Sequence, residues 1–332
     1  MWTASPSSSV RDEATRDKQR ASEATRASRT ERAGEAARER ASRGVRRGEA
    51  PRLKMLNALT IDVEEWFHIC AVPSLGRAAW DQLPSRVERT TRMVLDLCDR
   101  TNTRATFFVL GWVAERWPQL VADIAAAGHQ VGSHGHVHDR AYDLGERRFT
   151  EDVRASIAAI EATGSRPTCF RAPEWSINGR SMWALDALAR ERMTVDASMA
   201  PVRIVGDVRF PRTPHVRTTA AGPVTEVPPL VTDRFGQVMP IGWGWALRSS
   251  TPSTVLRTIE KANQAGAPAV LTVHPWEIDP DPPHVALPAR LRFAHYYRLH
   301  GFAGRLRQIL ESARFESIDA CLSSSAFLPS AS

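Results

Sequence analysis

From residue 55 onward, this chain alternates short apolar segments with segments of helical periodicity. The strand-like segments, rich in β-branched and aromatic residues, cover residues 56–61, 103–110, 129–133, 169–170, 194–195 and 269–273. Between them, apolar residues recur at helical spacing over 113–124, 149–160 and 182–188. Such repetition of strand and helix predicts an α/β fold whose mainly parallel sheet is either open or closed into a barrel.

Ionisable residues stand directly after five of these strand-like segments. They are Asp62, Glu64 and Glu65, then His134, His136 and His138, and then Arg171, Asp196 and His274. In a parallel barrel the carboxyl ends of the strands converge on one rim, and enzymes with this architecture carry out their chemistry there. The acids, bases and imidazoles of this chain therefore predict an active site at that rim.

Each motif has a plainer interpretation when it is taken alone. His134 and His138 are four residues apart, so on a helical turn they would share a face and could hold one metal ion. The zinc-protease motif needs a glutamate after the first histidine, and Gly135 stands there instead. Arg171 alone would be an ion-pair partner, and His274 alone would be a packed core histidine.

Together and in this order, the motifs resemble those of the polysaccharide deacetylase family, also called the NodB-homology or carbohydrate esterase 4 family. The family pattern has an acidic pair, an HxxxH, an RxP, a later aspartate and a final histidine after a hydrophobic strand. The matching residues are Asp62 and Glu64, His134 and His138, Arg171-Ala172-Pro173, Asp196, and His274. The resemblance covers residues 55–325 and implies a distorted (β/α) barrel with a C-terminal extension.

Two longer segments make the resemblance more specific. Residues 62–68 (DVEEWFH) and 274–280 (HPWEIDP) are similar to a subgroup found beside exosortase and PEP-CTERM exopolysaccharide loci. That subgroup carries an additional C-terminal region, which the resemblance places at about residues 225–325. The expected organisation is therefore a tail over residues 1–54 and a NodB-like domain over 55–325.

The resemblance implies that the protein hydrolyses N-acetyl groups of amino sugars with the help of a divalent cation. Glu64, His134 and His138 would hold this cation and leave positions open for water and substrate, as a catalytic ion requires. Zn²⁺ is the expected ion, with Co²⁺ and Mn²⁺ as alternatives. The expected partner is an N-acetylated polysaccharide or oligosaccharide, such as an exopolysaccharide or a peptidoglycan-like polymer.

The same resemblance assigns the proton transfers. Asp62 would be the base that takes a proton from the attacking water, and His274 would be the acid that protonates the departing amine. Arg171 is expected beside Asp62, and Asp196 is expected beside His274. A backbone N–H just after Pro173 would stabilise the negative oxygen of the intermediate.

The acidic motif departs from the family pattern in ways that leave one ligand open. The family commonly has two adjacent aspartates, whereas here Val63 stands between Asp62 and Glu64. Glu65 is a rival to Glu64 as the metal ligand. We expect His136, which lies between the two ligand histidines, to point away from the ion.

Tryptophans gather near the motifs, at positions 66, 175, 243, 245 and 276. Indole rings pack well against the apolar faces of sugars while their N–H groups find polar partners. We therefore expect Trp175, Trp245 and Trp276, together with Pro173, to contact a saccharide. Some of the tryptophans are expected to fill the core instead.

Three other functions agree less well with the sequence. An allantoinase-like hydrolase of a small cyclic amide would keep the fold, but the tryptophan-rich rim favours sugar. A catalytically silent carbohydrate-binding relative would need neither Asp62 nor His274. Residues 1–54 hold 14 of the 44 Lys and Arg and 8 of the 37 Asp and Glu, so the rest of the chain has a net charge of +1. A nucleic-acid-binding protein is disfavoured because the positive charge lies outside the predicted domain.

Residues 1–54 consist mostly of Ala, Arg, Glu, Ser and Thr, which predicts a disordered tail, and ordered-looking sequence begins at Met55, an alternative start. Neither a signal-peptide apolar stretch nor an 18-residue apolar run is found, so we expect a cytoplasmic protein without a transmembrane segment. Association with the cell envelope is the alternative if the start is misassigned. Four widely spaced cysteines predict no disulfide.

Overall fold

The structure, a computed structural model, describes residues 55–70, 72–324 and 330–331. The predicted tail over residues 1–54 lies outside the described residues. The strands are β1 (Leu56–Val63), β2 (Thr106–Val109), β3 (Gln130–Ser133), β4 (Cys169–Phe170), β5 (Val195–Asp196), β6 (His215–Thr219), β7 (Gly222–Glu226), β8 (Val231–Arg234), β9 (Gln237–Pro240), β10 (Val270–Val273), β11 (Arg314–Glu316) and β12 (Ser330–Ala331).

Helices connect most of the strands. They are α2 (Val87–Arg100), α3 (Gly111–Arg116), α4 (Pro118–Ala126), α5 (Ala141–Glu161), α6 (Trp183–Arg190), α7 (Gly244–Ser249), α8 (Pro252–Gln264), α9 (Ala289–Tyr296), α10 (Phe302–Ser312) and α11 (Ile318–Ser323). Four short 3₁₀ turns are η1 (Pro73–Leu75), η2 (Arg77–Gln82), η3 (Pro173–Trp175) and η4 (Pro275–Ile278).

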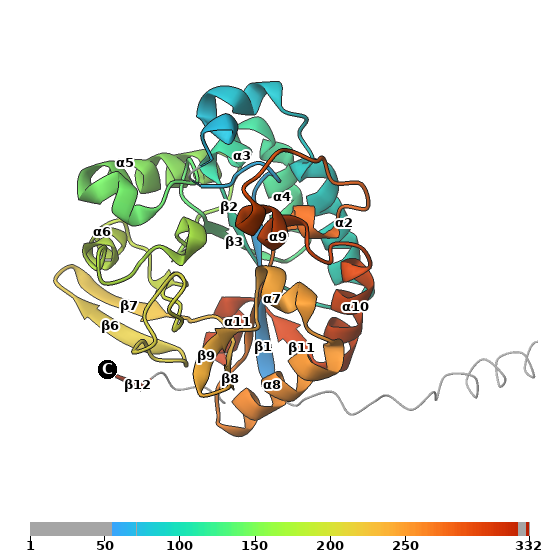
Figure 1. The fold of residues 1–332 in the computed structure, drawn as a ribbon. Coiled ribbons are helices and arrows are strands. Elements are labelled where there is room, and N and C mark those ends of the chain that lie inside the picture. Colours follow the sequence, from blue (N-terminus) through green and yellow to red (C-terminus); the bar gives the residue numbers. More distant parts are fainter. Residues whose placement is uncertain (1–54, 71, 325–329, 332) are drawn as a thin grey trace, which may run out of the picture. The chain divides into compact units, whose positions relative to one another are not determined.

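One curved sheet forms the centre of this fold (Figure 1). Its order is β10, β1, β2, β3, β4, β5, β7, β6 and β12, and β11 pairs with the start of β1. Within this sheet, all neighbouring strands are parallel except β6 and β7. The six strands expected from the sequence are all present, and helices lie around the outside of the sheet, so the predicted distorted (β/α) barrel is confirmed.

Loop backbone fills the gap in the barrel between β7 and β10. The Leu230 N–H donates to the Val270 carbonyl (3.0 Å), and the Thr272 N–H donates to the Gly242 carbonyl (2.8 Å). Residue 242 must be glycine, because a Cβ there would lie 2.8 Å from the Val270 oxygen. Trp243 forms an isolated bridge with Thr272, so the segment around 242 lies alongside β10 like a further strand.

Helix α2 supports the segment that follows β10. Its buried residues include Val87, Val94 and Leu97, which recur on one face of the helix. The helix contacts η4, the turn directly after His274. Burial of each such side chain stabilises the fold by roughly 1.5–3 kcal/mol, so α2 helps to hold η4 in place.

Across the described residues, no helix is both long and apolar enough to cross a membrane. The four cysteines, all within the described part of the chain, are free thiols, in agreement with the sequence analysis.

Candidate active site

Five of the residues expected at the rim, namely Asp62, Glu64, His134, His138 and His274, line one cavity of about 280 Å³. Asp62 and Glu64 come from the end of β1, His134 follows β3, and His274 follows β10. His138 lies on the same cavity wall. The neighbouring positions of β10, β1, β2 and β3 in the sheet explain why side chains more than 200 positions apart meet here.

Glu64, His134 and His138 form a cluster that suits a metal ion. Their ligand atoms all lie within 4.8 Å of one another, and all three residues are buried. Glu64 Oε2 lies 2.5 Å from His138 Nε2 and 3.7 Å from His134 Nε2. This oxygen has no hydrogen bond of regular geometry from any described residue. A buried carboxylate oxygen facing two imidazole nitrogens is a fitting donor set for Zn²⁺ or a similar cation, with positions left for other ligands.

The Arg171 carbonyl fixes the orientation of the His134 imidazole. The His134 Nδ1 lies 2.8 Å from this carbonyl, to which it can donate, so its Nε2 remains available toward Glu64.

The charges of the cluster shift the pKa values of its members. Burial raises the pKa of Glu64, but His138 and His274 outweigh this and lower it well below its usual value. Burial likewise lowers the pKa of His138, but Glu64 raises it well above the usual value. A cation bound here would therefore compete with the proton of His138.

The two ligand histidines share an irregular loop rather than the helical turn that we considered. The loop brings them together because Gly135 (φ 77°) and His138 (φ 49°) both adopt left-handed backbone conformations. A Cβ at residue 135 would lie 2.8 Å from Asp152 Oδ2, which accepts the His136 N–H (2.7 Å). The His136 side chain lies toward Glu115 (3.8 Å), so it points away from the cluster as expected.

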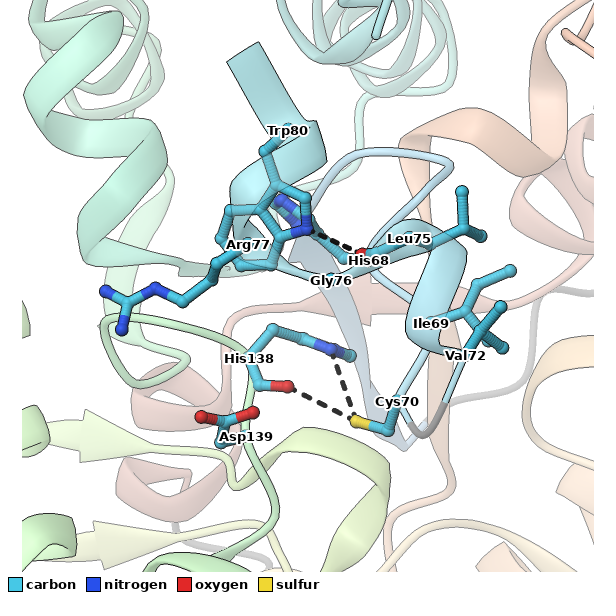
Figure 2. Close-up of a pocket in the computed structure, with 10 residues that line it drawn as sticks. All are labelled: His68, Ile69, Cys70, Val72, Leu75, Gly76, Arg77, Trp80, His138 and Asp139. Carbon is cyan, nitrogen blue, oxygen red and sulfur yellow. Dashed lines mark hydrogen bonds between the residues drawn. The ribbon is translucent and has the colours of Figure 1, made fainter. Parts of the chain in front are cut away.

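Figure 2 shows a second pocket behind His138, lined also by His68, Cys70 and Trp80. The Cys70 thiol donates to the His138 carbonyl (3.2 Å), and its Sγ lies 3.6 Å from His138 Nδ1. The His68 ring stacks on His138 with centroids 5.8 Å apart. These contacts position the imidazole of His138, and sequence reasoning had not singled out either Cys70 or His68 for this purpose.

Arg171 lies beside Asp62, as expected. Its Nη1 donates to Asp62 Oδ1 (2.8 Å) and to the Thr60 hydroxyl (2.7 Å), and its Nε donates to the Ala197 carbonyl (3.1 Å). Its guanidinium also stacks over the Phe108 ring at 4.4 Å. The fully buried arginine thus occupies one oxygen of Asp62 and leaves Oδ2 for other partners.

His274 faces both carboxylates of the acidic motif. Its Nε2 lies 3.9 Å from Asp62 Oδ2 and 3.8 Å from Glu64 Oε1. On the other side of the ring, Nδ1 lies 3.1 Å from Glu277 Oε2. Burial lowers the pKa of His274, but Glu277 and Glu64 raise it to about 9. The imidazole is therefore cationic at neutral pH and carries a proton toward the cavity.

The expected contact between Asp196 and His274 is wrong. Asp196 Oδ1 accepts from the Ser198 hydroxyl (2.5 Å), which in turn accepts the Ala172 N–H (2.7 Å). Burial raises the pKa of Asp196, whose carboxyl lies beside that of Glu226. Asp196 is the last residue of β5, whereas His274 follows β10, which stands at the other end of the path through β1 to β5.

Glu65 takes no part in the cluster of Glu64, His134 and His138. Its carboxylate accepts the backbone N–H groups of Arg86 (2.9 Å) and Val87 (3.2 Å) and the Ser85 hydroxyl. These groups lie at the start of α2, where backbone N–H donors need acceptors. Glu65 therefore caps α2, and Glu64 remains the carboxylate of the cluster.

The tryptophans have different roles from one another. Trp175, Trp243, Trp245 and Trp276 line the cavity, whereas Trp66 is buried in the core. The rings of Trp175 and Trp243 lie 4.9 Å apart, which makes an aromatic wall. Trp243 was not among the saccharide contacts that we expected.

Two of the expected saccharide contacts have other partners. The Trp276 Nε1 donates to Glu64 Oε1 (3.1 Å), and the rings of His274 and His295 stack on its indole at 5.3 and 4.1 Å. Trp276 therefore orients a ligand carboxylate, because its ring is already engaged within the protein. Pro173 is buried and does not line the cavity; it begins the turn η3, which carries Trp175.

Sequence comparison agrees with this geometry. Residues 78–191 match the family profile described as polysaccharide deacetylase, and residues 197–323 match a profile described as domain of unknown function DUF3473. Residues 78–191 form a polysaccharide deacetylase domain. Of the rim residues, Asp62 and Glu64 precede this matched region, whereas His274 lies inside the DUF3473 match.

Individual relatives are similar to this chain over part of their length. A peptidoglycan-N-acetylglucosamine deacetylase of Bacillus cereus is 32% identical over 88 residues, which are 26% of this chain and 41% of the relative. Chitin deacetylase 1 of Saccharomyces cerevisiae is 28% identical over 125 residues, which are 34% of this chain and 42% of the relative. This chain thus spans less than half the length of either curated relative.

One solved structure is similar over most of the chain. A crystal structure from Mycobacterium smegmatis, assigned to the polysaccharide deacetylases, superimposes with a TM-score of 0.51 at 18% identity. The match covers 81% of this chain and 90% of that chain. At this level of identity the similarity concerns the fold alone.

Proposed function

We propose that this protein is a metal-dependent hydrolase that removes N-acetyl groups from the amino sugars of a glycan. The observation that carries the proposal is the meeting of a metal-ligand cluster, a carboxylate and an imidazole in one cavity. The match to the polysaccharide deacetylase profile and the named activities of the relatives support the same reaction class.

The cluster supplies the site for the cation. A divalent cation held by Glu64, His134 and His138 would lower the pKa of a coordinated water and polarise the acetyl carbonyl. Trp276 supports this site from the other side because it donates to the second oxygen of Glu64. Zn²⁺ is the ion that we propose, since imidazole and carboxylate ligands in an open site suit it.

Asp62 and His274 are placed for the two proton transfers. Arg171 occupies Oδ1 of Asp62, so Oδ2 is the oxygen that takes the proton from the attacking water. His274 Nε2 lies 3.9 Å from that oxygen and delivers a proton to the departing sugar amine. Acid–base assistance of this kind is typically worth about 10²–10⁴-fold in rate.

The cavity wall supports a saccharide as the substrate. Trp175, Trp243 and Trp245 present indole rings to the cavity, and such rings pack against the C–H faces of sugars. The buried Trp175 Nε1 has no hydrogen-bond partner among the described residues, so it can donate to a hydroxyl or carbonyl of a bound sugar. N-acetylglucosamine polymers are the proposed substrate class, in line with the named relatives.

The test is acetate release from N-acetylglucosamine oligosaccharides before chelation, after chelation and after return of Zn²⁺. We expect activity to disappear on chelation and to return with the metal. The Asp62→Asn variant should lose turnover by at least about 10²-fold and keep its metal. Asp96→Asn, an exposed change on α2, is the matched control.

Two results would contradict the proposal. Loss of metal from the Asp62→Asn variant would show that the base and the ligand have been exchanged. Tight binding of the oligosaccharide without any acetate release from the metal-loaded protein would favour the silent carbohydrate-binding alternative.

A further inference from the structure

We propose that Arg248 and Glu277 form a buried pair that positions His274, and that the C-terminal region of unknown function completes the active site in this way. The inference rests on the proposed function and identifies residues outside the family's acidic, HxxxH and RxP motifs. Both residues lie within the segment 197–323 that matches the domain of unknown function.

Glu277 holds His274 through one carboxylate oxygen. Its Oε2 accepts the His274 backbone N–H (2.9 Å) and lies 3.1 Å from the ring Nδ1. Arg248 and His274 overcome the effect of burial and lower the pKa of Glu277, so the carboxylate is ionised and Nδ1 donates to it. With Nδ1 engaged, Nε2 is the nitrogen that faces Asp62 and Glu64.

Arg248 holds the other oxygen of Glu277. Its Nη1 donates to Glu277 Oε1, and both side chains are fully buried. A buried carboxylate without a partner is strongly disfavoured, and removal of one member of a buried pair leaves the other uncompensated. Glu277 therefore depends on Arg248 to remain both ionised and fixed.

Arg248 also joins the pair to α9. Its Nε donates to the Tyr297 carbonyl (2.9 Å), and its Nη2 donates to the carbonyls of Ala294 and His295 (3.2 Å for the latter). These carbonyls belong to the last turn of α9 and the residue after it, where helices lack internal donors and favour a cation. One guanidinium on α7 thus connects η4, which carries Glu277, with α9.

The pair fills the position that the resemblance assigned to Asp196. That aspartate is occupied by Ser198 and Glu226 and makes no ion pair with His274 among the described residues. Glu277 is three residues after His274 on the same turn, so it reaches Nδ1 without any contribution from β5. The carboxylate that orients His274 therefore comes from the turn η4 and not from β5.

The experiment compares Glu277→Gln with the wild type in the full chain loaded with Zn²⁺. Glutamine keeps the size of the side chain and removes its charge. We expect kcat on an N-acetylglucosamine oligosaccharide to fall about 10- to 100-fold, with KM and metal content within about two-fold of the wild type. Glu191→Gln, which removes a carboxylate from the distant ion pair with Arg154 (2.8 Å), is the matched control and should leave kcat unchanged.

A second comparison addresses Arg248. Arg248→Lys keeps a cation beside Glu277, whereas Arg248→Met removes it. We expect the lysine variant to retain more kcat than the methionine variant at equal metal content. Equal loss in both variants, or an unchanged kcat in Glu277→Gln, would overturn the proposal, and so would a kcat loss that follows metal loss.

A spectroscopic measurement separates this proposal from the proposed function. In protein with ¹⁵N-labelled histidine, assigned with His274→Ala, the Nδ1 proton of His274 should resonate downfield because it donates to a carboxylate. The signal should move upfield in Glu277→Gln. A wild type that releases no acetate but shows this shift would refute the activity and keep the pair. An absent or unshifted signal would refute the pair.

Discussion

Asp196 and Glu226 share a buried site that disfavours the ionisation of both carboxyl groups together. Burial and the neighbouring Asp196 raise the pKa of Glu226 well above its usual value, and burial also raises that of Asp196. The Met199 N–H donates to Glu226 (3.0 Å), and the Ser198 hydroxyl donates to Asp196 (2.5 Å). The folded protein therefore favours the protonated form of Glu226 more than the unfolded chain does.

This pair gives a pH dependence of stability with a defined sign. A carboxyl whose pKa is raised in the folded state binds its proton more tightly there than in the unfolded chain. The bound proton therefore stabilises the fold at low pH, and the free energy of unfolding falls as pH rises above 4.5, the ordinary pKa of Glu. Removing it with Glu226→Gln should reduce the fall in the free energy of unfolding between pH 5 and pH 8. One proton corresponds to at most about 1.4 kcal/mol per pH unit.

Urea denaturation of the wild type and Glu226→Gln at a series of pH values measures this slope. Glu260→Gln, an exposed change on α8, serves as the control and should keep the slope of the wild type. Parallel curves for the wild type and Glu226→Gln would show that the carboxyl group is ionised in the folded protein.

Sequence reasoning located most of the rim residues and the Arg171 partner of Asp62, but it failed on the partner of His274. Asp62, Glu64, His134 and His274 were found because each stands at the end of a strand, which a local pattern reveals. The partner of His274 was missed because it depends on which carboxylate the folded turn brings to Nδ1. Glu277 could have been predicted as this partner because it lies only three residues after His274. The contacts of Arg248 span 29 to 49 positions, and no local pattern in the sequence predicts them.

At the scale of the element, Glu65 links the acidic motif to α2. Its carboxylate accepts the N–H groups of Arg86 and Val87, so its loss leaves donors at the start of the helix without their acceptor. We expect Glu65→Ala to lower the free energy of unfolding by about 1–3 kcal/mol, while metal content remains that of the wild type.

Urea denaturation together with metal analysis tests this assignment. Glu88→Ala, which removes an exposed ion pair with Arg92 in the first turn of α2, is the control and should change stability by less than about 1 kcal/mol. If Glu65→Ala lost its metal while it remained folded, Glu65 would be a ligand.

The elements that sequence reasoning missed lie mainly in the C-terminal region. Strands β6 to β9 are half-exposed, and apolar and polar residues do not alternate clearly along them. Their segments were therefore not predicted as strands. The contacts of Leu230 and Gly242 with β10 are made by irregular backbone, which has no periodic signal. In contrast, β1 and β10 are buried along nearly their whole length and read as apolar runs.

At the scale of the whole molecule, the proposed metal ligands come from two separate parts of the chain. Glu64 follows β1, and His134 and His138 follow β3, so only the folded protein presents all three together. A ligand that binds the folded state alone stabilises it by about 2.7 kcal/mol at a hundred times its dissociation constant. We therefore expect Zn²⁺ to raise the Tm of the metal-free wild type.

Differential scanning calorimetry with and without Zn²⁺ measures this effect without reference to activity. The shift should disappear in His134→Ala and persist in His136→Ala, the control from the same loop whose side chain lies toward Glu115. A Zn²⁺-dependent Tm that is equal in His134→Ala and the wild type would place the metal elsewhere.

The two profile matches meet between residues 191 and 197, yet that boundary does not divide the fold. Strand β10, from the second match, pairs with β1 over Ala58–Ile61 in register with Val270–Val273. The strand that precedes the proposed acid therefore completes the same sheet as the strand that carries the proposed base. Because β10 comes from the second match and β1 precedes the first, the sheet forms only when the segments before and after this boundary fold together.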